Sequence, residues 1–271
     1  MSYLEAIVLA VLQGLTEFLP VSSSGHLVLA QYWFGHVNET NLLFDIMLHC
    51  ATVVAILVYF RNDWVTLARG LLNRPSTMMA SSVFSGAEWR TVLMVVVASI
   101  PTAILGLTIQ KIGMEVFSRP DIVGGLLMLT GVVLWVGRGK SHGRGIKEMK
   151  IVDAFIIGLV QGIAVLPGIS RSGSTIAVGL LLGLDRELIV RFSLLISIPA
   201  ILGATLLEML KVMDHLHDPI GPYLVGMGVA AVVGYWSIGV ILRLVKQDHF
   251  HLFSYYLWPV GMTILLWTYV L

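Results

Sequence analysis

Two related stretches organise the chain. The first is QGLTEFLPVSSSGH at residues 13–26, and the second is QGIAVLPGISRSGST at residues 161–175. In each, an apolar run reaches Gln-Gly, then Leu-Pro, then a short segment rich in Ser and Gly, before another apolar run begins. Because proline lacks a backbone N–H and clashes with the preceding turn, each stretch predicts a broken helix.

The composition is that of a membrane protein. Hydrophobic residues make up 57% of the chain and charged residues 12%, against roughly 25% charged residues in soluble domains. The formal net charge of +1 indicates no nucleic-acid partner. No Lys or Arg precedes the apolar run 7–12 and Glu17 follows it closely, so we expect no cleavable signal peptide.

The remaining apolar segments predict six transmembrane helices, because a spanning helix needs about 20 mostly apolar residues. The qualifying segments are about 42–60, 91–110, 121–138, 188–210, 222–243 and 252–271. Regions 2–36 and 151–185 each hold two shorter apolar runs around one broken stretch, and we interpret each region as a re-entrant helical hairpin. The expected fold is an all-α integral membrane protein with a single membrane domain over 1–271.

The Lys and Arg residues indicate the orientation. Most of them fall in four loops, which share one face if both hairpins return to their own side: 61–90, 138–150, 186–191 and 243–250. By the positive-inside rule this face is cytoplasmic and both termini lie outside. The hairpins then enter from opposite sides, so residues 1–138 and 151–271 are predicted to be two inverted repeats. In a membrane, two such breaks indicate a buried binding site.

Glu17 is the first candidate for chemistry, because an ionisable residue at membrane depth is costly and is usually functional. Gln13, four residues earlier, shares its helical face. The alternative is that Glu17 only pairs with a cation to hold two helices together. Asp45 and His49 also share a face, but both lie near the start of a span, where they could simply meet water. For Glu208 the sequence favours neither a functional nor a structural role.

The serine cluster of the first stretch is followed by an imidazole. His26 lies three residues after Ser23, and on a helical turn this spacing brings the ring near the hydroxyl. A hydroxyl beside a base is the minimum of an activated nucleophile. The alternative for any one of Ser22, Ser23 and Ser24 is that it caps the next helix.

Arg171 is the only Lys or Arg that this topology places at membrane depth, so it must meet an anion, either Glu17 or a ligand. Small polar residues surround it and precede the apolar run 176–184: Ser170, Ser172, Gly173, Ser174 and Thr175. A helix N-terminus offers unpaired N–H groups that suit phosphate, and arginine adds a two-pronged donor for phosphate oxygens. A carboxylate such as Glu17 could also hold a hard divalent cation.

The combined residues therefore predict phosphate chemistry on a substrate that arrives through lipid. The competing class is transport, because inverted repeats with broken helices are also a transporter layout, and a carrier could bind a lipid phosphate without cleaving it. A purely structural membrane subunit leaves Arg171 and both serine clusters unexplained.

The motifs resemble those of the undecaprenyl-diphosphate phosphatase family, the bacitracin-resistance proteins of bacterial inner membranes. Gln13-x-x-x-Glu17 resembles the acidic motif of that family, whose first position is Glu or Gln. The segment LPVSSSGH at 19–26 resembles its first serine motif, and PGISRSGST at 167–175 resembles its second. Length and hydropathy layout also fit over the whole chain.

The resemblance implies hydrolysis of undecaprenyl diphosphate to undecaprenyl phosphate and inorganic phosphate, which recycles the lipid carrier of cell-wall synthesis and confers bacitracin resistance. It implies a divalent cation, Mg²⁺ or Ca²⁺, and a homodimer in the bacterial inner membrane with its active site facing the periplasm. Bacitracin is expected to compete for the lipid substrate rather than bind the protein. A carrier or flippase for undecaprenyl phosphate is the alternative.

The resemblance also assigns roles by position. Glu17 and Gln13 belong to the metal or acidic site, although the neutral amide of Gln13 is a weaker cation ligand than a carboxylate. Ser23 and His26 are alternative nucleophiles, and Glu17 and Arg171 complete the expected catalytic set. The expected substrate-binding residues are Ser22, Ser24, Gly25, Ser170, Ser172, Gly173, Ser174 and Thr175.

Overall fold

The computed structural model describes residues 1–34, 42–72, 86–112, 119–212 and 220–270, and the elements in these ranges are helices. The α-helices are α1 (Tyr3–Thr16), α2 (Ser23–Trp33), α3 (Leu42–Tyr59), α4 (Arg61–Leu72), α6 (Ala87–Ile112), α7 (Pro120–Val136), α8 (Ile151–Ile163), α9 (Arg171–Leu181), α10 (Arg186–Val212), α11 (Ile220–Lys246) and α12 (Ser254–Val270). A short 3-10 helix, η3 (Phe250–Phe253), precedes α12. The all-α prediction is therefore confirmed.

Three helices within the described ranges are long and apolar enough to cross a membrane: Ala87–Lys111, Arg186–Met209 and Ile220–Lys246. The helices α3 and α4 add a fourth candidate if they are counted as one span bent by 67°. Large apolar side chains on the outer surface are exposed, such as Trp236 at 73% and Ile104 at 62%. A helix that is apolar even on its outer face is typical of a multi-pass membrane protein.

The helix α4 differs from the sequence-based expectation, which assigned residues 61–90 to one polar loop. Residues 61–72 instead form a helix that turns sharply away from α3. The reason is its amphipathic pattern, because Trp64 and Leu67 lie one turn apart and turn inward while Arg61 and Asp63 are exposed. Of the remaining predicted loop, residues 73–85 lie outside the described residues.

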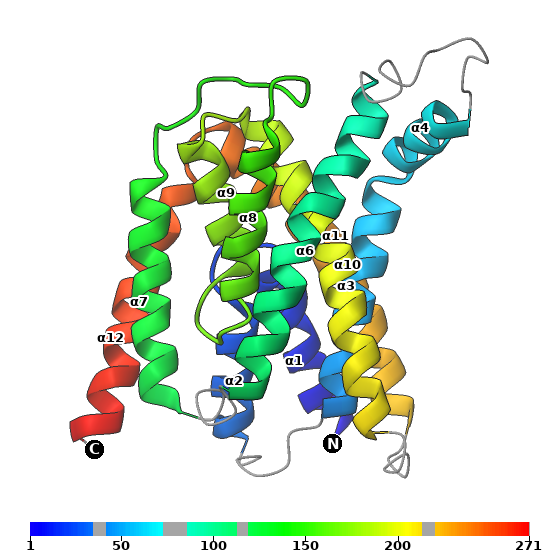
Figure 1. Cartoon of the computed structure of the whole chain (residues 1–271). Helices are drawn as coiled ribbons and strands as arrows, with labels where there is room; N and C mark the ends of the chain where they lie inside the picture. The colour runs from blue at the N-terminus through cyan, green and yellow to red at the C-terminus, as the bar shows by residue number, and fades with distance from the viewer. Residues whose placement is uncertain (35–41, 73–85, 113–118, 213–219, 271) are drawn as a thin grey trace.

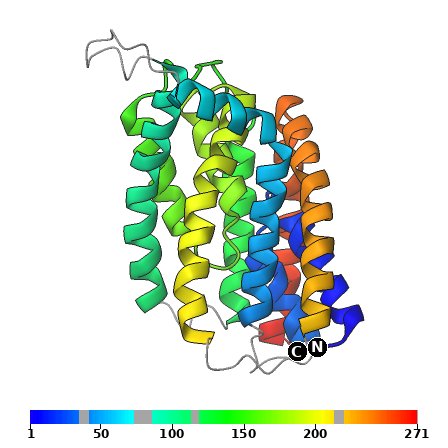
Figure 2. The same ribbon diagram turned by 90° about the vertical axis from the view of Figure 1, so that its right-hand side faces the viewer.

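Both proline-containing stretches break a helix as predicted. The first break lies between α1 and α2 at residues 17–22, and the second between α8 and α9 at residues 164–170. In Figure 1 the α1–α2 pair lies in the lower half of the bundle and the α8–α9 pair in the upper half, while both chain ends lie at the bottom. Figure 2, turned by 90°, shows the same long helices running from one end of the bundle to the other.

Small residues let each short helix pack closely on a long one. The helix α1 packs along α11, and α8 packs along α6. A Cβ added to Gly14 would lie 2.8 Å from the Cβ of Val233, and one added to Gly158 would lie 2.1 Å from the carbonyl oxygen of Ala98. Glycine at these positions therefore sets the distance between the broken helices and the long helices that support them.

The segment 138–150, predicted as a basic loop between the two repeats, is tied to the helices around it. The Arg144 guanidinium donates to the Asp153 carboxylate at 2.6 Å and to the carbonyl of Leu182 at 2.7 Å. The Arg90 guanidinium donates to the carbonyl of Met149 at 2.6 Å. These bonds connect the start of α8 to the end of α9 and so help to fix the second broken pair.

Candidate functional site

The two breaks contact one another directly. Ser22 has a φ of 70°, which is unusual for a residue with a side chain. Its hydroxyl accepts hydrogen bonds from the backbone N–H groups of Gly168 at 3.0 Å and Gly25 at 3.4 Å. The hydroxyl of Thr130 on α7 donates to the Gly168 carbonyl at 2.9 Å and accepts from the N–H of Ser170 at 3.1 Å. The motifs therefore form one local structure, although they are far apart in sequence.

Glu17 lies at the centre of this structure and is bonded by three side chains. The Arg171 guanidinium donates to Oε1 at 2.5 Å, the Ser23 hydroxyl donates to Oε2 at 2.6 Å, and the Gln13 amide donates to Oε2 at 3.0 Å. The side chains of Glu17 and Arg171 are only 5% and 15% exposed. The expectation that Arg171 meets an anion is confirmed, and Glu17 is that anion.

A cavity of about 330 Å³ opens beside this pair. The predicted site residues that line it are Glu17, Ser22, Ser23, Ser24, Ser170 and Arg171. Thr16 on α1, Gln31 on α2 and residues of four other helices contribute the remaining polar side chains of the lining, which are Asp45, His49, Thr102, Gln161, Thr205 and Glu208. The lining combines these polar groups with apolar residues such as Leu27, Val165 and Ile201, and such a mixture suits a ligand with a charged head and an apolar tail.

Arg171 has bonding capacity beyond its ion pair. Its Nη2 is bound to Glu17, whereas its Nη1 is buried and has no hydrogen-bond partner among the described residues. A buried donor without an acceptor is costly. An oxygen atom of a ligand in the cavity would remove that cost after a small movement of the guanidinium.

His26 is not bonded to Ser23, contrary to the sequence-based expectation. Its Nδ1 lies 2.8 Å from the carbonyl oxygen of Ser22, which only accepts, so Nδ1 carries the hydrogen. Its Nε2 lies 2.8 Å from the hydroxyl of Tyr256 on α12, and the two rings are stacked. The ring lies back over the preceding turn, as helical side chains do. The Ser23 hydroxyl is bonded to Glu17 instead.

His49 is a site residue that the sequence suggested only weakly. Its Nδ1 lies 2.7 Å from the carbonyl oxygen of Asp45, and its Nε2 lies 3.8 Å from Oε2 of Glu17. The Asp45 carboxylate accepts from Nε2 of Gln31 at 3.0 and 3.1 Å. The spacing of Asp45 and His49 placed them on one face, but only the packing of α3 against the first break brings that face into the cavity.

Gln161 is a second residue that sequence reasoning left without a role, although it corresponds in position to Gln13. It is 2% exposed and lines the cavity. Its amide donates at 3.2 Å to the hydroxyl of Thr102 and to the carbonyl of Ile196. The repeated Gln-Gly dipeptide was the signal that could have found it.

Several predicted substrate-binding residues do not line the cavity. These residues are Gly25, Ser172, Gly173, Ser174 and Thr175, and all of them are buried in the packing around the breaks. A Cβ on Gly25, for example, would lie 3.2 Å from the backbone nitrogen of Gly168. They shape the site from behind, because small residues at these positions let the two breaks approach each other.

The start of α9 shows what these small residues do. The Thr175 hydroxyl donates to the Arg171 carbonyl at 2.8 Å and lies 2.6 Å from the hydroxyl of Ser193. The Ser172 hydroxyl donates to the Leu19 carbonyl at 3.3 Å. Ser170 caps the helix and accepts from the N–H of Gly173 at 3.1 Å, so this N–H already has a partner. Arg171 is therefore the main donor that α9 directs into the cavity.

The predicted metal ligands Glu17 and Gln13 are hydrogen-bonded to each other. Among the residues that the structure describes, no group of three or more His, Cys, Asp or Glu side chains could hold a metal ion.

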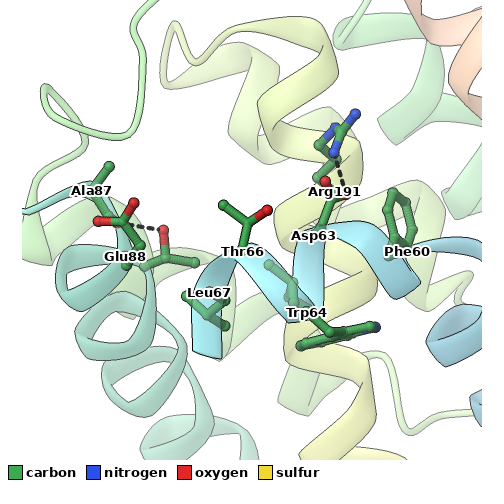
Figure 3. A pocket seen from close by; sticks show the side chains of 10 residues that line it. Phe60, Asp63, Trp64, Thr66, Leu67, Ala87, Glu88 and Arg191 are labelled. Atoms are coloured by element: carbon green, nitrogen blue, oxygen red, sulfur yellow. Dashed lines mark hydrogen bonds and ion pairs between the residues drawn. The ribbon is translucent and has the colours of Figure 1, made fainter. Parts of the chain in front are cut away.

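A second cavity, of about 230 Å³, lies between α4, α6 and α10 (Figure 3). Its walls include the rings of Phe60 and Trp64, and the guanidinium of Arg191 lies over the Phe60 ring and is paired with Asp63. None of the predicted site residues lines it. The larger cavity is therefore the candidate site.

The fold and the site define a multi-pass membrane protein with a cavity and a buried ion pair at the junction of two broken helices. The comparisons with known proteins give the particular family. A family model described as bacitracin resistance protein BacA matches residues 6–263, so the chain belongs to this family.

Similar proteins cover nearly the whole chain. The undecaprenyl-diphosphatase of Desulfosudis oleivorans is 45% identical, over 96% of this chain and 97% of its own length. The undecaprenyl-diphosphatase of Desulfatibacillum aliphaticivorans is 38% identical over 100% of both chains. That of Carboxydothermus hydrogenoformans is 37% identical, over 98% of this chain and 97% of its own length.

Proposed function

We propose that this protein hydrolyses undecaprenyl diphosphate to undecaprenyl phosphate and inorganic phosphate. The names of its relatives support this activity, and bacitracin resistance fits the family name. The structural observation that carries the proposal is the bonded set of Arg171, Glu17 and Ser23 at the wall of a cavity. This set combines an anion-binding cation, a proton acceptor and a hydroxyl nucleophile.

Binding of the diphosphate begins at Arg171. Ser24, Ser170 and Arg171 line the cavity, and Nη1 of Arg171 has no hydrogen-bond partner among the described residues. After a small movement of the guanidinium, Nη1 can donate to a phosphate oxygen, and the two hydroxyls offer further donors. Guanidinium groups bind phosphate through two parallel hydrogen bonds. As Arg171 turns from Glu17 to the phosphate, the charge of the buried carboxylate loses its partner.

Ser23 is the nucleophile in this mechanism. Its oxygen attacks the terminal phosphorus while its proton passes to Oε2 of Glu17, 2.6 Å away. The bond from the terminal phosphorus to the bridging oxygen breaks, and undecaprenyl phosphate leaves. Water then cleaves the phosphoserine and releases inorganic phosphate. Electrostatic stabilisation by Arg171 carries most of the rate, as is usual in phosphoryl transfer.

The route through His26, either as nucleophile or as the base that activates Ser23 or water, stays a prediction. It would require the ring to leave the Ser22 carbonyl and the Tyr256 hydroxyl. In the arrangement observed here, His26 holds α2 against α12 and fixes the turn that presents Ser23.

The proposal includes the membrane architecture expected from the sequence. Six spans and two re-entrant hairpins would form inverted repeats over 1–138 and 151–271 in the bacterial inner membrane, with the site open to the periplasm. The positions of α1–α2 in the lower half and α8–α9 in the upper half of Figure 1 support this arrangement. A homodimer, and competition between bacitracin and the enzyme for the lipid, belong to the same proposal.

The test is release of inorganic phosphate from a C55 isoprenoid diphosphate by the purified full-length protein in detergent. Arg171→Ala is expected to lower the rate about 10³-fold, because it removes the charge that stabilises the transferred phosphoryl group. Arg191→Ala, which breaks the surface pair with Asp63 and lies outside the site, is the matched control and should stay within about threefold of wild type.

Thermal unfolding separates a chemical effect from a folding defect, and Arg171→Lys provides a second variant that keeps the charge. A folded wild-type protein that binds the lipid and releases no phosphate would contradict the proposal. That result would favour a carrier for lipid phosphates.

A further inference from the structure

Glu17, the carboxylate expected to hold a divalent cation, is already balanced by protein groups. Its Oε1 is paired with Arg171 at 2.5 Å, and its Oε2 accepts from Ser23 at 2.6 Å and from Gln13 at 3.0 Å. The pair has no net charge. A divalent cation placed on this carboxylate would lie close to the Arg171 guanidinium, which is buried and repels it.

Gln13 occupies the position of an expected metal ligand, but its amide is hydrogen-bonded to Glu17 instead. Its Nε2 donates to Glu17, which leaves its Oε1 buried and without a partner among the described residues. Glutamate at this position would put two carboxylates in contact, and such a pair needs a cation or a shared proton. The amide of Gln13 removes that need.

The other acidic groups of the cavity do not compensate. The Asp45 carboxylate is held by Gln31, and Nε2 of His49 lies 3.8 Å from Oε2 of Glu17. Glu208 is the third acidic residue of the lining. Across the described ranges, no three His, Cys, Asp or Glu side chains are grouped to hold a metal ion. The residues therefore do not fit a divalent cation as a permanent part of the protein.

We propose that the divalent cation enters this site already bound to the lipid diphosphate, so that the true substrate is the Mg²⁺ or Ca²⁺ complex. Magnesium in proteins is commonly bound by one or two carboxylates together with phosphate oxygens of the substrate. The diphosphate supplies the negative charge that Gln13 does not, and Arg171 can then contact phosphate. This inference rests on the proposed function, because it specifies the form of that substrate.

The experiment is calorimetric titration of the full-length protein in detergent with CaCl₂ and with MgCl₂. Without diphosphate, wild type is expected to show no saturable binding up to about 1 mM, the weak end of calcium sites. With a non-hydrolysable, methylene-bridged isoprenyl diphosphonate present, saturable binding appears. Gln13→Glu is expected to bind the free cation at least about tenfold more tightly than wild type.

Gln161→Glu is the matched control, because it adds the same charge at a buried glutamine that corresponds in position to Gln13 and lines the cavity. Its amide is bonded to Thr102 and a carbonyl rather than to a carboxylate, so no pair of carboxylates is created. No gain in cation binding is expected. If Gln13→Glu does not fold, wild-type rates are compared at a fixed concentration of the metal–diphosphate complex, where a change in free metal should have no effect.

Stoichiometric cation binding by wild type without diphosphate would overturn the inference. Loss of that binding in Glu17→Gln or in Asp45→Asn would show which carboxylate holds the cation, and either result counts against the inference. Phosphate release is measured on the same preparations. A protein that releases no phosphate but binds cations only together with the diphosphonate would contradict the proposed function and leave this inference standing, so the two failures are distinguishable.

Discussion

The hydroxyl of Ser23 makes the most consequential single contact in the site. A bond of 2.6 Å from a hydroxyl to a buried carboxylate is short, as is typical of hydrogen bonds to a charged acceptor. It aligns the serine proton with a group that can accept it. The same carboxylate oxygen is held by Gln13, so the acceptor is fixed before substrate arrives.

Replacing Ser23 with Ala is expected to lower phosphate release by about 10²-fold or more, because the nucleophile is lost and only transition-state electrostatics remains. The measurement is steady-state release from the C55 diphosphate. Ser99→Ala is the control, since the Ser99 hydroxyl donates to the Val95 carbonyl of its own helix and Ser99 is not among the residues that line the cavity. A fully active Ser23→Ala would exclude the serine route and return attention to His26.

The broken helices depend on long helices for their positions. Each short helix leaves backbone groups free at its break, and these groups are satisfied across the junction by Ser22 and Thr130. Close packing on α6 and α11 then holds the pair in register. If the distance between α8 and α6 increased by the width of a side chain, Arg171 would move relative to Glu17.

Gly158→Ala is expected to destabilise the protein by about 1–3 kcal/mol, the usual cost of overpacking a tight contact. The new Cβ would lie 2.1 Å from the carbonyl oxygen of Ala98, and a backbone atom cannot rotate away. Gly125→Ala on α7 is the control, because nothing lies within 4 Å of its Cβ position. Thermal unfolding in detergent compares them.

Alanine at Gly125 should be neutral or stabilising by up to about 1 kcal/mol through helix propensity. If both substitutions lowered the unfolding temperature equally, close approach of α8 to α6 would not be the cause.

At the scale of the whole molecule, the two ends of the helix bundle are expected to lie on opposite sides of the membrane. The segment 138–150 and the bend between α3 and α4 lie at the upper end in Figure 1, and the chain termini lie at the lower end. The upper end carries exposed cations such as Lys140 and Lys147. By the positive-inside rule we expect the upper end to be cytoplasmic, as the proposed architecture has it.

This orientation is testable with single cysteines, because Cys50 is the only natural cysteine. In a Cys50→Ser background, Lys111→Cys at the lower end of α6 should react with a membrane-impermeant maleimide in intact spheroplasts. Lys140→Cys should react only after the membrane is permeabilised. Both lysines are exposed in the structure, so access to reagent is limited by the membrane alone. The reverse labelling pattern would contradict the proposed orientation, and the Cys50→Ser protein reports background.

Local patterns were enough to predict the helical class, the long apolar helices and both helix breaks. Hydropathy and proline act within a few residues, so they can be read without knowing the fold. The same holds for Glu17 and Arg171, because a charge in an apolar chain is costly wherever its partner lies.

The partner of each polar group followed from tertiary packing. Ser23 meets Glu17 across a helix break, where helical spacing no longer applies, and His26 turns to the Ser22 carbonyl and Tyr256 instead. His49 approaches Glu17 only because α3 packs beside the first break. Short hydrogen bonds depend on displacements of less than 1 Å between distant segments. Sequence periodicity carries no information at that scale, so it identified the polar residues of the site without identifying their bonds.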